Sequence, residues 1–325
     1  GRRCLAKYSG MVAALRNNDT AGFLTPLEDM HATACAGKAF ETWFAADALE
    51  ACRRSMGGTA YSQYSGIPAL IADFGVLTTG GGDNIVMAQQ AARYLVKQFQ
   101  RSSISLEGTS VYYLAQNIAD VVLEPNSFLI LPTLLAVIGS LTRARLANAV
   151  ELLNGEQHRG ASFAMAWNVV VNDLVDVVEC HSAHYRLESF IEFISSGNHL
   201  SNGTKEILCQ MARLDALSFI QHRVSWFIEA GLFSTVALPL LRSTCSHLCA
   251  TLRRDAIALV DAFDHSDESL KAPIAPHDGD MYAKYSTACM QSSVAGNPAP
   301  YWQSIVLPHL TDSPLLKQPS LFSKL

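Results

Sequence analysis

Residues 51–97 read ACRRSMGGTAYSQYSGIPALIADFGVLTTGGGDNIVMAQQAARYLVK, and this stretch decides the fold. It begins at the end of an apolar pattern with helical spacing that covers residues 27–56. Gly57 and Gly58 follow that pattern and predict the end of one long helix. Residues 59–82 are rich in Gly, Ser and Tyr, which predicts a loop.

Start signals precede both helices that flank this loop. Thr25 at the cap and Pro26 in the first turn predict where the first helix begins. The second expected helix covers residues 83–100, with Gly82 or Asp83 as its N-cap.

Helical periodicity continues almost to the carboxyl end. Further helices are expected over 131–153, 162–195, 205–230, 235–251 and 254–263. No alternating run is long enough to argue for a strand. The sequence therefore predicts an all-α fold, a helical bundle with two lobes.

Composition narrows the possible partners. The chain has 325 residues, 49% hydrophobic and 16% charged, against about 25% charged in typical domains. Its net charge of -5 provides no broad cationic field for nucleic acid or an anionic membrane. The apolar run at residues 128–141 is too short for a membrane span and predicts a buried helix. The shortage of charge suggests a surface covered by a subunit partner.

The ends and the cysteines add context. The chain begins at Gly1 inside a helical pattern and without an initiator methionine, so we expect a truncated or processed chain. The eight cysteines have no CxxC spacing, which predicts buried thiols in a reducing compartment.

The stretch at residues 51–97 resembles the flavin and active-site region of peroxisomal acyl-CoA oxidases. In that family a helix ends in CRxxCGGHGY, continues through SGLP and reaches T-(Y/F)-E-G-(D/E)-N before a helix VMxxQxARYLxK. The positions that match in register are Cys52, Arg53, Gly57, Gly58, Tyr61, Ser65, Gly66, Pro68, Thr79, Gly82, Asp83, Asn84, Val86, Met87, Gln90, Ala92, Arg93, Tyr94, Leu95 and Lys97.

Two other regions share the resemblance. Residues 30–39 are similar to the family's LHAxxSGLKA helix, although residues 35–37 (Cys-Ala-Gly) depart from its SGL. Residues 256–264 and 277–282 are similar to its ALVDAF(D/N) and YDGxxY segments. The resemblance covers only the carboxyl-terminal half of such an enzyme.

The resemblance implies a division of the chain. Residues 1–105 would be the carboxyl-terminal part of the flavin-side helical-bundle domain and 106–127 a linker. Residues 128–310 would form the second helical domain and 311–325 a tail.

That tail ends in Ser323-Lys324-Leu325, the tripeptide read by the peroxisomal import receptor. Together with the oxidase-like body it predicts a peroxisome, or a related organelle such as the glycosome.

The chemistry that the resemblance implies is oxidation of a fatty acyl-CoA. A glutamate removes the α proton, the β hydride passes to FAD, and oxygen then takes the electrons to give hydrogen peroxide. In register with that glutamate this chain has Gly81, which has no side chain to accept a proton. Asp83 lies two residues on and is a weak substitute, and we expect it to cap the following helix. No catalytic residue is therefore assigned.

FAD contacts are implied at four positions: Gly57, Gly58, Asn84 and Gln90. Thr59 and Ala60 replace the family's histidine and glycine. The alternative is that the four residues serve folding alone.

Two groups of thiols and imidazoles are candidate metal ligands by their helical spacing. They are Cys180, His181 and His184, and Cys245, His247 and Cys249. Neither has a partner cluster at metal spacing, so we predict no metal site.

Three functional hypotheses follow. The chain is the carboxyl-terminal portion of an oxidase acting as a homodimer or heterodimer, impaired when alone. Alternatively it is a catalytically dead scaffold or partner subunit for an active oxidase, or one piece of a larger subunit whose other piece holds the flavin domain.

Overall fold

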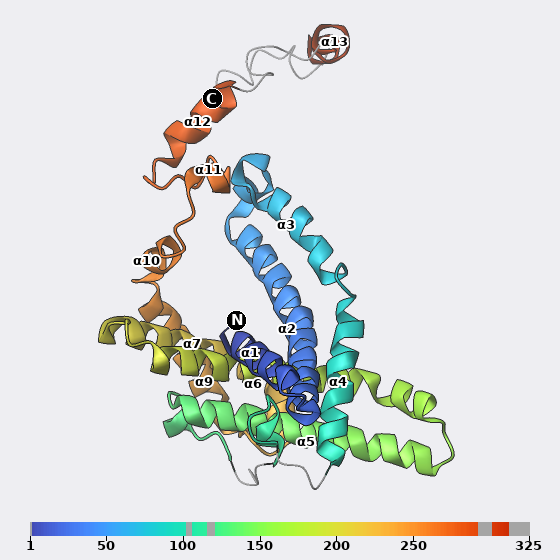
Figure 1. Cartoon of the computed structure of the whole chain (residues 1–325). Coiled ribbons are helices and arrows are strands. Elements are labelled where there is room, and N and C mark those ends of the chain that lie inside the picture. The colour runs from blue at the N-terminus through green and yellow to red at the C-terminus, as the bar shows by residue number, and fades with distance from the viewer. Residues whose placement is uncertain (1, 102–105, 116–120, 292–300, 312–325) are drawn as a thin grey trace. The chain divides into compact units, whose positions relative to one another are not determined.

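The computed structural model describes residues 2–101, 106–115, 121–291 and 301–311. Within these ranges the chain forms helices and turns and no strand, which confirms the all-α prediction (Figure 1). The α-helices are α1 Arg2–Arg16, α2 Thr20–Ser55, α3 Ile67–Gly75, α4 Asn84–Gln100, α5 Leu131–His158, α6 Phe163–Ser196, α7 Asn202–His222, α8 Val224–Glu229, α9 Leu238–Leu252, α10 Ala256–Asp261, α11 Asp267–Leu270, α12 Met281–Gln291 and α13 Leu307–Thr311.

Two compact units make up the chain. Unit 1 consists of Gly1–Ala48 and Asp73–Phe263, and unit 2 of Leu49–Ala72 and Asp264–Leu325. In unit 1, α5 and α6 pair along their length as a helical hairpin (Figure 1). Helix α4 packs on α6 and α5, and α7 packs on α6, α5 and α9.

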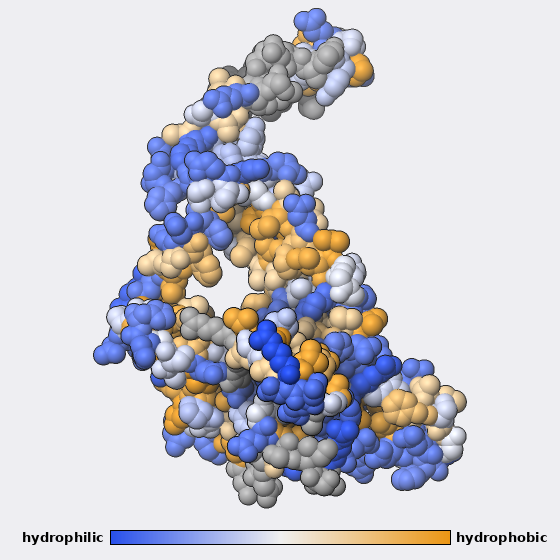
Figure 2. Space-filling view, viewed as in Figure 1, coloured by the Kyte–Doolittle hydropathy of each residue, from blue (hydrophilic) through white to orange (hydrophobic). Residues whose placement is uncertain are grey.

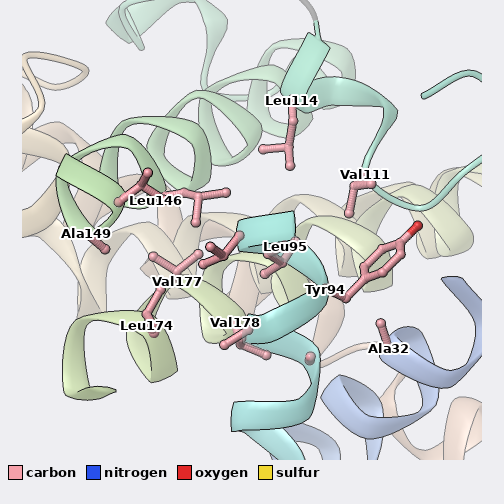
Figure 3. Packing of buried hydrophobic residues seen from close by; sticks show 14 of the residues in the cluster. Ala32, Tyr94, Leu95, Val111, Leu114, Leu146, Ala149, Leu174, Val177 and Val178 are labelled. Atoms are coloured by element: carbon pink, nitrogen blue, oxygen red, sulfur yellow. The ribbon is translucent and has the colours of Figure 1, made fainter. Parts of the chain in front are cut away.

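The core of unit 1 comes from residues that repeat at helical spacing. Leu95 of α4 packs with Leu146 of α5 and Leu174 of α6, all nearly free of solvent contact (Figure 3). A second cluster joins α5, α6, α7 and α9, with Phe128 and Phe227 fully buried. Burial of each leucine or phenylalanine favours the folded state by about 2 kcal/mol, so both clusters stabilise the packing of these helices.

The first long helix begins earlier than predicted. Helix α2 starts at Thr20, so Pro26 lies inside it and the expected start at Thr25 is wrong. Asp19 provides the cap, since its Oδ1 accepts a hydrogen bond of 2.9 Å from the Gly22 amide. Pro26 lacks an N–H and deprives the helix only of the bond to the Gly22 carbonyl, which a long helix tolerates near its end.

Residues 59–82 were predicted as a loop but contain a helix. Helix α3 begins near Pro68, a favourable residue for a first turn, and its sequence IPALIADFG is strongly apolar. None of its residues is buried, and Figure 2 shows orange apolar surface over α3. The surrounding glycines and serines obscured this short helix in the sequence.

Other boundaries differ less. Helix α5 continues past its expected end at residue 153 to His158, and α6 begins at Phe163, one residue after its expected start. The expected helix over 205–230 is two helices, because Arg223 leaves helical geometry and pairs with Glu179. Within the described residues, no helix combines the length and apolarity that a bilayer crossing requires.

The cysteine prediction holds in part. Cys35 and Cys180 are buried free thiols, and burial raises the pKa of both. Cys52 and Cys249 are exposed, which corrects the expectation for those two. Both lie on solvent-facing positions of helices, where helical spacing alone did not separate the faces.

One buried carboxylate joins three segments of unit 1. Asp29 of α2 is 1% exposed, and its Oδ1 accepts hydrogen bonds from the Tyr94 hydroxyl of α4 and from the Ser110 amide and hydroxyl. Its Oδ2 pairs with Lys7 of α1. Burial, followed by the charge of Asp29, raises the pKa of Tyr94 well above its usual range, so the phenol remains a donor.

A second buried polar group lies between α5 and α6. The Tyr113 hydroxyl oxygen is 2.9 Å from Nδ1 of His181, and the Tyr113 ring packs 4.1 Å from that of His184. A Cβ at Gly139 would lie 3.2 Å from His184, so glycine permits this close packing. Burial lowers the pKa of His181 to about 4, and the ring is neutral at pH 7.

Replacing Asp29 should unfold unit 1 more easily. We expect Asp29→Asn to lower the free energy of unfolding by about 3 kcal/mol, because the amide group turns a donor toward Lys7 and weakens the accepted bonds. The exposed Asp47→Asn in the same helix is the control, with a change below about 0.5 kcal/mol. Urea titration measures both, and equal losses would contradict the assignment.

His181 should make stability depend on pH. The unfolded side chain binds a proton below pH 6.5 and the folded one only near pH 4, so its contribution is complete above pH 6.5 and is lost as pH falls to 4. The expected loss is about 3 kcal/mol over that window. His181→Gln should flatten the stability profile by that amount, whereas exposed His199→Gln should not.

Candidate functional site

The loop before α4 contains Gly81, the position that the family resemblance places in register with a general base. Gly81 and Gly82 have φ angles of 70° and 102°, a left-handed conformation that favours glycine. A Cβ placed on Gly81 would meet no atom within 4 Å. The position therefore has room for a side chain but a backbone that disfavours one.

Asp83 ends the loop and caps α4, as predicted. Its Oδ1 accepts a hydrogen bond of 2.9 Å from the Ile85 amide. That bond holds the carboxylate at the helix start, where the dipole favours negative charge. The Asp83 carboxylate therefore has a structural role as the N-cap of α4.

Lys38 of α2 holds the loop against the helix. Its Nζ donates to the Gly82 carbonyl, to Oδ1 of Asn84 at 2.6 Å and to the Thr78 carbonyl at 3.5 Å. An ammonium has three donors, and this arrangement uses all of them. In the sequence Lys38 stands out only as part of the motif at residues 30–39. Its role in holding the loop could not be predicted, because its partners lie 40 to 46 residues away.

Asn84 completes the tie between α2 and α4. It is 1% exposed, and its Nδ2 donates to the Ala39 carbonyl at 3.0 Å and to Thr42 Oγ1 at 2.9 Å. Both amide hydrogens are used inside unit 1, which gives Asn84 a structural role. Its contact with FAD remains a prediction.

The other predicted flavin positions lie elsewhere on the chain. Gly57, in unit 2, has a φ of 64° and ends α2 as predicted, and residues 57–61 form a 3-10 turn. A Cβ on Gly57 or Gly58 would meet no atom within 4 Å, so their backbone is open. Gln90, in unit 1, is half-buried on α4.

The two thiol and imidazole groups have different surroundings. Cys180 lies in the apolar core and His181 contacts Tyr113. Cys245 is partly buried, and burial raises its pKa, while Cys249 is exposed. Among the described residues, no three His, Cys, Asp or Glu side chains converge as metal ligands. The predicted targeting residues Ser323, Lys324 and Leu325 lie outside the described residues.

Two family models match the chain. Residues 1–96 match the model described as "Acyl-CoA oxidase, C-alpha1 domain", and residues 131–311 match "Acyl-CoA oxidase". Peroxisomal acyl-coenzyme A oxidase 1 of Mus musculus is 31% identical over 271 residues, which is 80% of this chain and 40% of that protein. The chain thus spans less than half the length of this relative.

Solved structures agree with the fold. Acyl-CoA oxidase 3 from Yarrowia lipolytica matches with a TM-score of 0.87 and 25% identity over 96% of this chain and 46% of that chain. Acyl-CoA oxidase-1 of Caenorhabditis elegans, solved in complex with FAD and ATP, matches with a TM-score of 0.83 and 22% identity, covering 95% and 46%.

Removing the Lys38 ammonium should loosen the loop. We expect Lys38→Met to speed amide exchange in residues 80–85 by about tenfold or more, because opening the loop no longer breaks the Lys38 bonds. The free energy of unfolding should fall by about 1 to 2 kcal/mol. Lys97→Met, which removes only an exposed pair with Glu28, is the control. Unchanged exchange in the loop would contradict the assigned role.

Proposed function

The chain belongs to the acyl-CoA oxidase family, and from this membership we propose that it is the carboxyl-terminal helical portion of a FAD-dependent oxidase of fatty acyl-CoA. The reaction would give a trans-2-enoyl-CoA and hydrogen peroxide, a step of fatty acid β-oxidation. We further propose that the chain alone is impaired, because Gly81 replaces the family's glutamate.

One observation carries this proposal. Hydrogen bonds hold the loop at residues 78–84 in place, but Gly81, at the proposed position of the general base, has no side chain. Lys38 and Asn84 fix the loop to α2, and Asp83 starts α4. Gly81 offers no atom that accepts the α proton. The loop backbone also suits glycine, since a glutamate with a φ near 70° would cost about 1 to 2 kcal/mol.

FAD, when bound, would supply the hydride acceptor. Gly57 and Gly58 would contact it through their backbone, which is open because a Cβ on either residue would meet no atom within 4 Å. Gln90 remains a proposed contact, and Asn84 would act by fixing the loop. These assignments rest on the family resemblance of each position.

The remaining parts of the proposal concern assembly and location. Relatives are named as peroxisomal enzymes, and Ser323-Lys324-Leu325 would direct this chain to the same organelle through the import receptor. An oxidase subunit is the proposed partner, as a homodimer or heterodimer. Residues 1–105 and 128–310 remain the proposed domains, separated by a linker and followed by a tail from 311.

An oxidase assay tests the proposal. The purified chain with added FAD should release hydrogen peroxide from palmitoyl-CoA at least about a hundredfold more slowly than an intact oxidase, as expected when a general base is missing. An intact acyl-CoA oxidase assayed in parallel is the positive control. Peroxide release by the chain at a rate near that of the control would overturn the proposed impairment.

A further inference from the structure

Two thiols lie one turn apart on helix α9 of unit 1 (Figure 1). They belong to Cys245 and Cys249, and both are free. Residues at this spacing face the same side of a helix. Cys245 packs against the apolar cluster of α5, α6, α7 and α9, while Cys249 is exposed. The pair therefore lies at the edge of the core, with one thiol partly shielded and the other open to solvent.

The two thiols are close enough to affect each other. Burial raises the pKa of Cys245, and the charge of Cys249 raises it further. A cation that both sulfur atoms share removes this repulsion, because a thiol that coordinates a metal ion loses its proton. Repulsion between the two thiolates thus becomes attraction to the ion.

The spacing suits a bridging ion better than a disulfide. Cβ atoms one turn apart on a helix are separated by about 5 to 6 Å, whereas a disulfide requires about 3.5 to 4.5 Å. Two metal–sulfur bonds of about 2.3 Å each join sulfur atoms up to about 4.6 Å apart. An ion therefore fits between these side chains without a change in the helix backbone.

The number of ligands favours a two-coordinate ion. Among the described residues, no third His, Cys, Asp or Glu side chain joins the pair. His247 lies two residues from each cysteine and so faces another side of the helix. Structural zinc sites have four ligands, and the prediction of no metal site from the sequence rests on that requirement. Copper(I) differs, because it is a soft ion that selects thiolates and is stable with two of them.

Charge on the same helix agrees with a monovalent ion. Helix α9 contains no Asp or Glu. Arg242 precedes Cys245 by about one turn, and Arg253 follows Cys249 by about one turn. Both arginines are exposed, and neither forms an ion pair with another described residue. Two thiolates with one monovalent cation keep one net negative charge, which the guanidinium groups stabilise. A divalent ion would leave the pair neutral and lose that attraction.

We propose that Cys245 and Cys249 form a two-coordinate site for copper(I) on α9. Each thiol exchanges its proton for a bond to the ion, so one copper(I) binds, two protons leave and nothing is oxidised. The site goes beyond the proposed oxidase function and requires neither FAD nor acyl-CoA.

Competition with the chelator bicinchoninate, under anaerobic reducing conditions, tests the site on the full chain. The chain should withdraw copper(I) from the coloured chelate, and its tightest binding should correspond to one ion per chain. Loss of the visible absorbance of the chelate measures this uptake.

Three variants locate the ion. Cys249→Ser should weaken the tightest binding by more than about tenfold, since even groups that only orient a ligand change metal affinity by that factor. The position is exposed, so folding is retained. Cys52→Ser removes another exposed thiol and should change nothing. The double variant Cys249→Ala with Ala250→Cys keeps the number of thiols but moves one off the face of Cys245, and it should bind as weakly as Cys249→Ser.

Phenylarsine oxide gives an independent measure of the geometry. Its arsenic forms bonds to two thiols and its oxygen leaves as water, so it reacts stably only with thiols that lie close together. Trypsin cleaves after Arg242 and Arg253 and releases residues 243–253, which contain both cysteines. Mass spectrometry should find the arsenic adduct on this peptide, and not on the corresponding peptide of the double variant.

Each measurement has an outcome that overturns the proposal. In the competition it is a chain that leaves copper(I) with the chelator, or equal effects of Cys249→Ser and Cys52→Ser. For the geometry it is a double variant that binds copper(I) as tightly as the unchanged chain, or a peptide at residues 243–253 without arsenic.

Discussion

The buried carboxylate of Asp29 is the interaction on which unit 1 depends. It accepts hydrogen bonds from α4 and from the segment at Ser110, and it pairs with Lys7 of α1. A buried charge is costly unless donors surround it, so these segments are fixed relative to α2. Leu95 and Tyr94 of α4 then pack into the core, as Figure 3 shows.

Helices α2 and α4 also hold the loop of the candidate site. Lys38 and Asn84 fasten the loop to α2, and Asp83 starts α4, so the parts that shape the loop are present. At Gly81, which the proposal aligns with the family's general base, the chain has no side chain. A Cβ at Gly81 would meet no atom within 4 Å, so the packing of the described residues does not depend on a side chain at this position.

Local sequence signals predicted most of the helices but not the hydrogen bonds and ion pairs that hold them together. Helical spacing predicted α4 and α6, and the Asp83 cap correctly marked the start of α4. Pro26 misplaced the start of α2, because a proline in the second turn has the same local pattern as one in the first. The ties made by Asp29 and Lys38 were not predictable, since their partners lie 22 to 81 residues away and no periodicity links them.

Only 16% of the residues are charged, and the apolar helix α3 has no buried residue, so part of the apolar surface of the chain is exposed. The bonds that Asp29 and Lys38 of α2 make to Tyr94 and Asn84 keep α4 and the loop before it in place. Native-state hydrogen exchange on the purified chain tests this most directly. The account predicts that amides of α4 exchange only through global unfolding, and those of α3 by local opening. Exchange in α4 as fast as in α3 would contradict it.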